Sequence, residues 1–289
     1  MPKAHPTISG FAFSFTFKPS PSPQDVQVQL WKNGSCDIAP DTILFLGVGQ
    51  TGKIPKWLAD HLPPEVLVVE GIPYWHAGPT EEDLETFTAE FVSRTLSFVQ
   101  EAFGAKSYNI IGHSQAAYGA VLLGLQKSDA IQNVGLLFPL GLNVRHLGST
   151  GEERWKSLKK RSLRSMVQWE QTPFHDVTNI YAGYRLLHTI RADKTHFKDK
   201  FIVGVSYDLL PDVKLLTEQL QIAGTGLIVG LAGNDKLFAA HEIRDTLEEV
   251  DPINLTILEL SSATHGSIAK RSHRAFIQEF VNAVRSHKI

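Results

Sequence analysis

The chain has 289 residues, 43% of them hydrophobic and 20% charged, and its 28 basic and 30 acidic side chains give a formal net charge of −2. A chain so close to neutral has no overall basic field for nucleic acid, so we expect no nucleic-acid partner. Its single cysteine, Cys36, excludes an internal disulfide framework. This length suits one large α/β domain, and we expect a single domain over residues 1–289.

Two strands are expected near the amino terminus. Residues 11–17, FAFSFTF, alternate aromatic with smaller residues, which is the period of a strand and not the continuous apolar core of a signal peptide. A turn rich in Pro and Ser separates them from a second strand over 26–31. No later run approaches the roughly 20 apolar residues of a membrane span. We therefore expect no stable membrane insertion and a cytoplasmic location.

Six short apolar runs follow, of the kind typical of strands buried on both faces of a parallel sheet. They cover residues 42–47, 65–71, 107–112, 134–141, 226–233 and 255–261. Helical patterns separate them, and the clearest begins at Thr80, a candidate N-cap with Asp83 three residues later. This alternation predicts the α/β class, with a mostly parallel central sheet flanked by helices.

Residues 142–222 interrupt the alternation after the sixth predicted strand, because their pattern is chiefly helical. An insertion there would emerge at the carboxyl edge of the sheet, where α/β proteins bind ligands. We therefore expect an inserted helical cap or lid. Its first helix is rich in Lys and Arg, which could attract an anionic substrate or a membrane surface, although a solvated basic face is the simpler interpretation.

The loop after the third predicted strand, GVGQTGK at 47–53, nearly spells a phosphate-binding P-loop. The hydroxyl that should hold Mg²⁺ is replaced by Ile54, and Pro55 follows it. Phosphate binding is therefore a weak hypothesis for this loop, and another use has to be considered.

A serine corner is the strongest chemical signal. In YNIIGHSQAAYG, residues 108–119, a strand turns abruptly into a helix at Ser114. This arrangement exposes the hydroxyl and places the next amide at the amino end of the helix. Gly112 stands two residues before the serine, while Ala116 occupies the position where G-x-S-x-G has its last glycine.

A nucleophilic serine needs a base, and the base needs an orienting acid. Asp235 follows the predicted strand 226–233 and His265 follows 255–261, which puts both at the same sheet edge as Ser114. The rival acid is Asp208, within the predicted cap. The rival bases are His241 and His273, both in helical patterns.

Over nearly its whole length the chain resembles the α/β-hydrolase fold superfamily. The family's nucleophile, acid and histidine match Ser114, Asp235 and His265. The resemblance also implies an oxyanion hole built from the amide of Gln115 and from Val48 or Gly49, although the histidine that often begins this loop in the family is absent here. We accordingly prefer oxyanion binding over phosphate binding for residues 47–53.

The resemblance implies a serine hydrolase that cleaves a carboxylic ester, thioester or lactone of a small to medium apolar acyl substrate through an acyl-enzyme on Ser114, with no metal and no organic cofactor. Tyr74, Trp75 and His113 are candidates for contacting the substrate. The alternatives are a C–C bond hydrolase, an acyltransferase, or a ligand-binding member of the fold with little turnover. The oligomeric state is not predicted.

Overall fold

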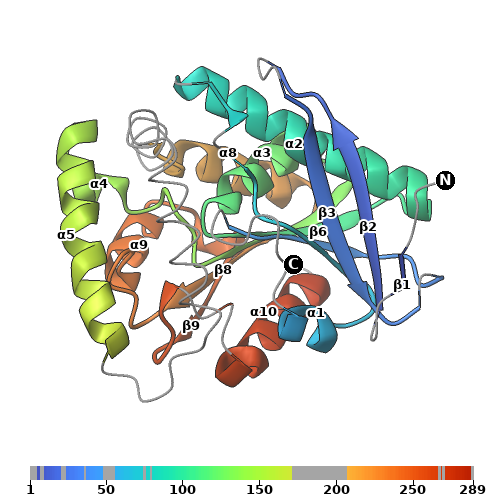
Figure 1. The fold of residues 1–289 in the computed structure, drawn as a ribbon. Coiled ribbons are helices and arrows are strands. Elements are labelled where there is room, and N and C mark those ends of the chain that lie inside the picture. Colours follow the sequence, from blue (N-terminus) through green and yellow to red (C-terminus); the bar gives the residue numbers. More distant parts are fainter. Residues whose placement is uncertain are drawn as a thin grey trace.

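The computed structural model describes residues 5–6, 10–20, 24–35, 37–47, 56–73, 76–78, 80–170, 207–265, 268 and 271–287. A twisted sheet runs through their centre, with helices on both sides (Figure 1). None of the helices in these ranges is long and apolar enough to cross a lipid bilayer.

Nine strands form this sheet within the described residues, in the order β1-β2-β3-β5-β4-β6-β7-β8-β9. The pairs β1–β2, β2–β3 and β3–β5 are antiparallel, and every pair from β5 to β9 is parallel. All eight predicted strands are confirmed, and β1 is an additional short edge strand. The bounds are β1 His5–Pro6, β2 Gly10–Phe17, β3 Val26–Asn33, β4 Thr42–Phe45, β5 Val66–Val69, β6 Tyr108–His113, β7 Ile131–Leu137, β8 Leu227–Ala232 and β9 Leu255–Leu260.

Helices cover the two faces of the sheet over separate apolar cores. Along β4, Ile43 and Phe45 face the core formed with α2, α3, α8 and α9, while Leu44 faces the core formed with α1 and α10. This alternation explains why the parallel strands are apolar at successive positions. The helices are α1 Lys56–His61, α2 Glu81–Phe103, α3 Ala116–Gln126, α4 Val144–Leu147, α5 Gly151–Glu170, α8 Leu210–Ile222, α9 Ala240–Leu247 and α10 Arg274–Ser286, with short 3₁₀ turns at Pro252–Asn254 and Arg271–His273.

The predicted start of α2 is confirmed. The Thr80 hydroxyl accepts a hydrogen bond from the Asp83 amide at 3.1 Å, and the Asp83 carboxylate accepts one from the Thr80 amide at 3.1 Å. This reciprocal pair is a capping box. It fixes the residue at which α2 begins, in the connection from β5 to β6.

The position of β4 in the sheet creates a topological switch point. Because β4 lies between β5 and β6, the chain moves to one side of β4 for β5 and then crosses to the other side for β6. The carboxyl ends of β4 and β6 therefore lie at a topological switch point, where ligands bind in open α/β sheets.

The chain makes an excursion between Gly141 and Leu209, and the two ends of the excursion meet: the Leu209 amide donates to the Gly141 carbonyl at 3.1 Å. Its described part holds α4 and α5, and α5 lies at the outer edge of the molecule near α9 (Figure 1). Helix α8 instead packs against α3 over the sheet, where Leu216 approaches Gly124. The cap predicted over residues 142–222 stays a prediction. Within this range α8 differs from α4 and α5, because α8 packs on α3 over the sheet.

Candidate active site

Ser114 occupies a strained corner directly after β6. Its φ is 57°, in the left-handed region that residues other than glycine rarely adopt. The Ser114 amide donates to the Leu137 carbonyl at 2.9 Å, and its carbonyl accepts from the amides of Ala117 and Leu140, each at 3.1 Å. Strain of this kind costs about 1–3 kcal/mol and persists only where surrounding structure enforces it, as these backbone bonds do here. The corner has the geometry expected of a nucleophile elbow.

Close packing of strand and helix explains the small residues around the corner. A Cβ on Gly112 would lie 2.4 Å from the Ala116 carbonyl oxygen and 2.7 Å from the Ala117 Cα. Only glycine therefore fits at 112. Ala116 is itself fully buried, so the corner accommodates alanine where the five-residue pattern has its last glycine.

The three residues predicted as a triad lie together in hydrogen-bonded contact. Ser114 Oγ is 2.7 Å from His265 Nε2, and His265 Nδ1 is 3.0 Å from Asp235 Oδ2. Ser114 follows β6, Asp235 follows β8 and His265 follows β9, so parallel strands bring all three to one edge of the sheet. The geometry permits proton transfer from the serine hydroxyl to the histidine, with the carboxylate orienting the ring.

A turn after β8 fixes the carboxylate. The amides of Leu237 and Phe238 donate to Asp235 Oδ1 at 2.8 and 3.1 Å, which leaves Oδ2 for His265. The Phe238 ring lies against the His265 ring, with centroids 4.8 Å apart. Acid and base are therefore held by the same short turn.

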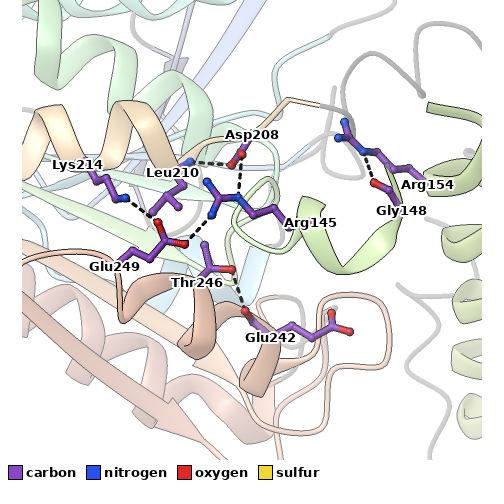
Figure 2. A network of polar contacts seen from close by, with 9 residues as sticks. All are labelled: Arg145, Gly148, Arg154, Asp208, Leu210, Lys214, Glu242, Thr246 and Glu249. Atoms are coloured by element: carbon purple, nitrogen blue, oxygen red, sulfur yellow. Dashed lines mark hydrogen bonds and ion pairs between the residues drawn. The ribbon is translucent and has the colours of Figure 1, made fainter. Parts of the chain in front are cut away.

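The rival acid has other partners. Asp208 accepts from Arg145 Nε at 3.3 Å and from the Leu210 amide at 3.2 Å at the start of α8. Figure 2 shows it in a polar network in which Arg145 also reaches Glu249. Asp208 therefore stabilises the return of the chain into α8, and Asp235 is the carboxylate beside His265.

His113, a predicted substrate contact, lies beneath the corner with 5% of its surface exposed. Its Nδ1 accepts a hydrogen bond from the Gly47 amide at 3.2 Å. Its ring centroid is 5.8 Å from that of His265. Burial, followed by the charge of His265, lowers the pKa of His113 to about 3, so the ring is neutral at physiological pH. Contact between His113 and a substrate stays a prediction.

Of the remaining predicted site residues, the structure describes only Gln115. Gln115 is the N-cap of α3, which places its amide at the positive end of that helix, next to the serine. Val48, Gly49, Tyr74 and Trp75 lie outside the described residues, and their roles stay predictions.

Phe138 is a feature that the sequence did not indicate. The apolar run 134–141 predicts a longer strand, but β7 ends at Leu137 and Phe138 turns into the left-handed region with φ 48°. The Phe138 amide donates to the Gly230 carbonyl at 2.8 Å. Its ring packs in parallel against Phe276 and edge-on against His113, both with centroids 6.1 Å apart. A bulky residue in this conformation is unusual, and it lies next to the triad.

Arg161 departs from the solvated basic face expected of its helix. Its guanidinium binds both carboxylate oxygens of Glu242, at 2.6 and 2.7 Å, and the two side chains are only 19% and 12% exposed. It also donates to the Leu237 carbonyl at 3.3 Å. Arg161 therefore connects α5 to the turn that holds Asp235. Its bond to Glu242 joins residues 81 positions apart, and no local sequence pattern indicates it.

Within the residues that the structure describes, no three His, Cys, Asp or Glu side chains gather in a way that could hold a metal ion.

No family model and no curated protein sequence matches the chain. Solved structures do resemble it. A hydrolase from Pseudomonas aeruginosa PA01 has 12% identity and a TM-score of 0.62, over 94% of this chain and 98% of the other. MGS-M2, an α/β hydrolase from a Medee basin deep-sea metagenome library, has 14% identity and a TM-score of 0.57, over 93% and 97%. A thermophilic esterase from Thermogutta terrifontis has 13% identity and a TM-score of 0.55, over 94% and 99%. The chain therefore has the α/β-hydrolase fold.

Proposed function

We propose that the protein is a serine hydrolase that cleaves a carboxylic ester, thioester or lactone of a small to medium apolar substrate. The observation that carries the proposal is the contact between Ser114 Oγ and His265 Nε2 at 2.7 Å, with His265 Nδ1 at 3.0 Å from Asp235. A serine becomes a useful nucleophile when a base oriented in this way can accept its proton.

In the proposed reaction His265 takes the hydroxyl proton as Ser114 Oγ attacks the carbonyl carbon. Asp235 stabilises the resulting imidazolium, which then gives its proton to the leaving group, an alcohol from an ester or lactone and a thiol from a thioester. The developing oxyanion would be stabilised by the Gln115 amide and by an amide of the loop at Val48 or Gly49, a contribution of roughly 10²- to 10³-fold in rate for each donor. Water, activated by the same histidine, releases the acyl group and regenerates the serine. The sequence of steps requires no metal and no organic cofactor.

The preference for an apolar acyl group rests on the side chains around the triad. The Phe238 ring packs on the His265 ring, with centroids 4.8 Å apart. Leu140 is bonded to Ser114 through its amide. The likeness to an esterase agrees with ester cleavage, although C–C bond hydrolysis, acyl transfer and ligand binding with little turnover could use the same fold.

We further propose that the excursion acts as a cap over this edge of the sheet. Arg161 of α5 bonds to the turn that carries Asp235, which brings the excursion close to the triad. Part of this segment would then contribute to the substrate pocket.

The test is release of nitrophenol from a series of nitrophenyl esters, from acetate to palmitate, by the wild type, Ser114→Ala and Ser97→Ala. Ser97 is an exposed serine of α2 and serves as the matched control. We expect turnover in the wild type and the control and nearly none in Ser114→Ala. The preferred chain length would measure the acyl pocket. Equal activity in all three proteins would refute the assignment of Ser114.

A further inference from the structure

The proposed mechanism leaves the imidazole of His113 without a part in the chemistry, although it is almost fully buried next to the nucleophile in the chain and its ring centroid lies 5.8 Å from that of the base. We propose that His113 is a positioning residue. By accepting a hydrogen bond from the Gly47 amide, it holds the chain that follows β4 against the nucleophile. This inference rests on the proposed hydrolase function and goes beyond it, because it assigns His113 to the protein's own backbone and not to a substrate.

The hydrogen bonds at the end of β4 show how the chain leaves the sheet. The Leu46 amide still donates to the Val69 carbonyl of β5 at 3.1 Å. One residue later the Gly47 amide donates to a side chain, His113 Nδ1, at 3.2 Å in a buried contact. A buried amide without a partner would cost roughly 1–3 kcal/mol. His113 therefore supplies the acceptor at the point where the strand pairing ends.

The same contact sets the chain directly beside the nucleophile. A Cβ on Gly47 would lie 2.8 Å from Ser114 Cβ and 3.1 Å from His113 Nδ1. A side chain at position 47 would collide with Ser114, so only glycine lets the backbone pass this close to the serine. Val48 and Gly49, the predicted oxyanion donors, are the next two residues in the chain.

The protonation state of His113 suits this role. Nδ1 can accept the Gly47 amide only without a proton, and burial followed by the charge of His265 lowers the His113 pKa to about 3. A neutral ring also places no positive charge 5.8 Å from the ring of His265, which becomes an imidazolium during the proposed reaction. Phe138 packs edge-on against the ring and restricts its movement.

Two substitutions separate the acceptor from the bulk of the side chain. His113→Asn can place its amide oxygen where Nδ1 lies, whereas His113→Leu fills the space without an acceptor. We expect the Leu variant to lose roughly 10²-fold in kcat with KM changed less than about threefold, since a misplaced oxyanion loop affects the transition state more than substrate binding. The Asn variant should retain kcat within about tenfold of the wild type. Melting temperatures of both variants identify any loss that is due only to unfolding.

Hydrogen exchange at the Gly47 amide gives a readout that does not depend on turnover. The amide should exchange slowly in the wild type and in His113→Asn, and faster in His113→Leu. Equal kcat in the Leu variant and the wild type, or equal losses in the Asn and Leu variants when both are folded, would overturn the role of His113 alone. A wild type that hydrolyses none of the esters would overturn the proposed function, and this inference with it.

Discussion

Gly112→Ala is the most direct test of how the serine corner is built. The added methyl group would lie 2.4 Å from the Ala116 carbonyl oxygen, 2.7 Å from its carbonyl carbon and 2.7 Å from the Ala117 Cα. All three are backbone atoms, so no side-chain rotation can relieve the contacts, and β6 and α3 must separate. Overpacking of a rigid core costs about 1–3 kcal/mol, and backbone contacts as short as these place the expected loss near 3 kcal/mol. For a chain of this size that corresponds to a melting temperature lower by roughly 6–12 °C.

Gly112→Ala should lower kcat as well as the melting temperature, because Ser114 is two residues from the substituted position. A displacement of about 1 Å at the nucleophile would lower kcat by roughly 10²-fold. Gly124→Ala is the control: its nearest atom is the Leu216 Cδ1 at 2.8 Å, the end of a side chain that can rotate. Calorimetry and ester hydrolysis on both variants would measure the two effects. A Gly112→Ala protein with the wild-type melting temperature and kcat would refute the argument that the close approach of β6 and α3 forms the corner.

Three further predictions concern the acid and the pair formed by Arg161 and Glu242. Asp235→Asn should lower kcat by roughly 10³- to 10⁴-fold with little change in melting temperature, because it removes the charge that orients His265; a loss below tenfold in ester hydrolysis would exclude Asp235 as the acid. Arg161→Met should lower the free energy of unfolding by about 3 kcal/mol, since it leaves the buried Glu242 carboxylate without its counter-ion and with only the neutral Asn143 amide beside it, and Arg161→Met with Glu242→Met should recover most of that loss in urea titrations. Burial opposes ionisation of Glu242, but hydrogen bonds from Arg161 and Asn143 outweigh it and hold the pKa below its ordinary value of 4.5. The pair should therefore stabilise the fold above about pH 4.5 and lose this contribution as the pH falls through the lowered pKa, so melting curves between pH 7 and 3 should converge for the wild type and the double variant; parallel curves would contradict this.

The sequence predicts those parts of the structure that have local signals. The strands, the capping box at Thr80 and the serine corner each depend on a few neighbouring residues. Asp235 and His265 could be predicted because each follows a strand, and the carboxyl ends of parallel strands meet at one edge.

Other features depend on contacts between distant residues, for which the sequence carries no local signal. The bond from Gly47 to His113 spans 66 positions, and the pairing of Arg161 with Glu242 spans 81. Nothing in the pattern of α5 distinguishes Arg161 from the exposed lysines beside it. The early end of β7 was likewise missed, because the apolar run continues past Leu137 while the backbone of Phe138 turns.

The hydrogen bond between Gly141 and Leu209 has a consequence for how such a protein can diversify. Because the chain leaves and re-enters the domain at one point, the intervening segment could be lengthened, shortened or exchanged without separating the strands that carry Ser114, Asp235 and His265. A library that varies the length of this segment but keeps Arg161, which bonds to Glu242 and to the turn at Leu237, would test whether the segment sets the substrate range. The boundary for such grafts is the pair of residues whose backbones already meet.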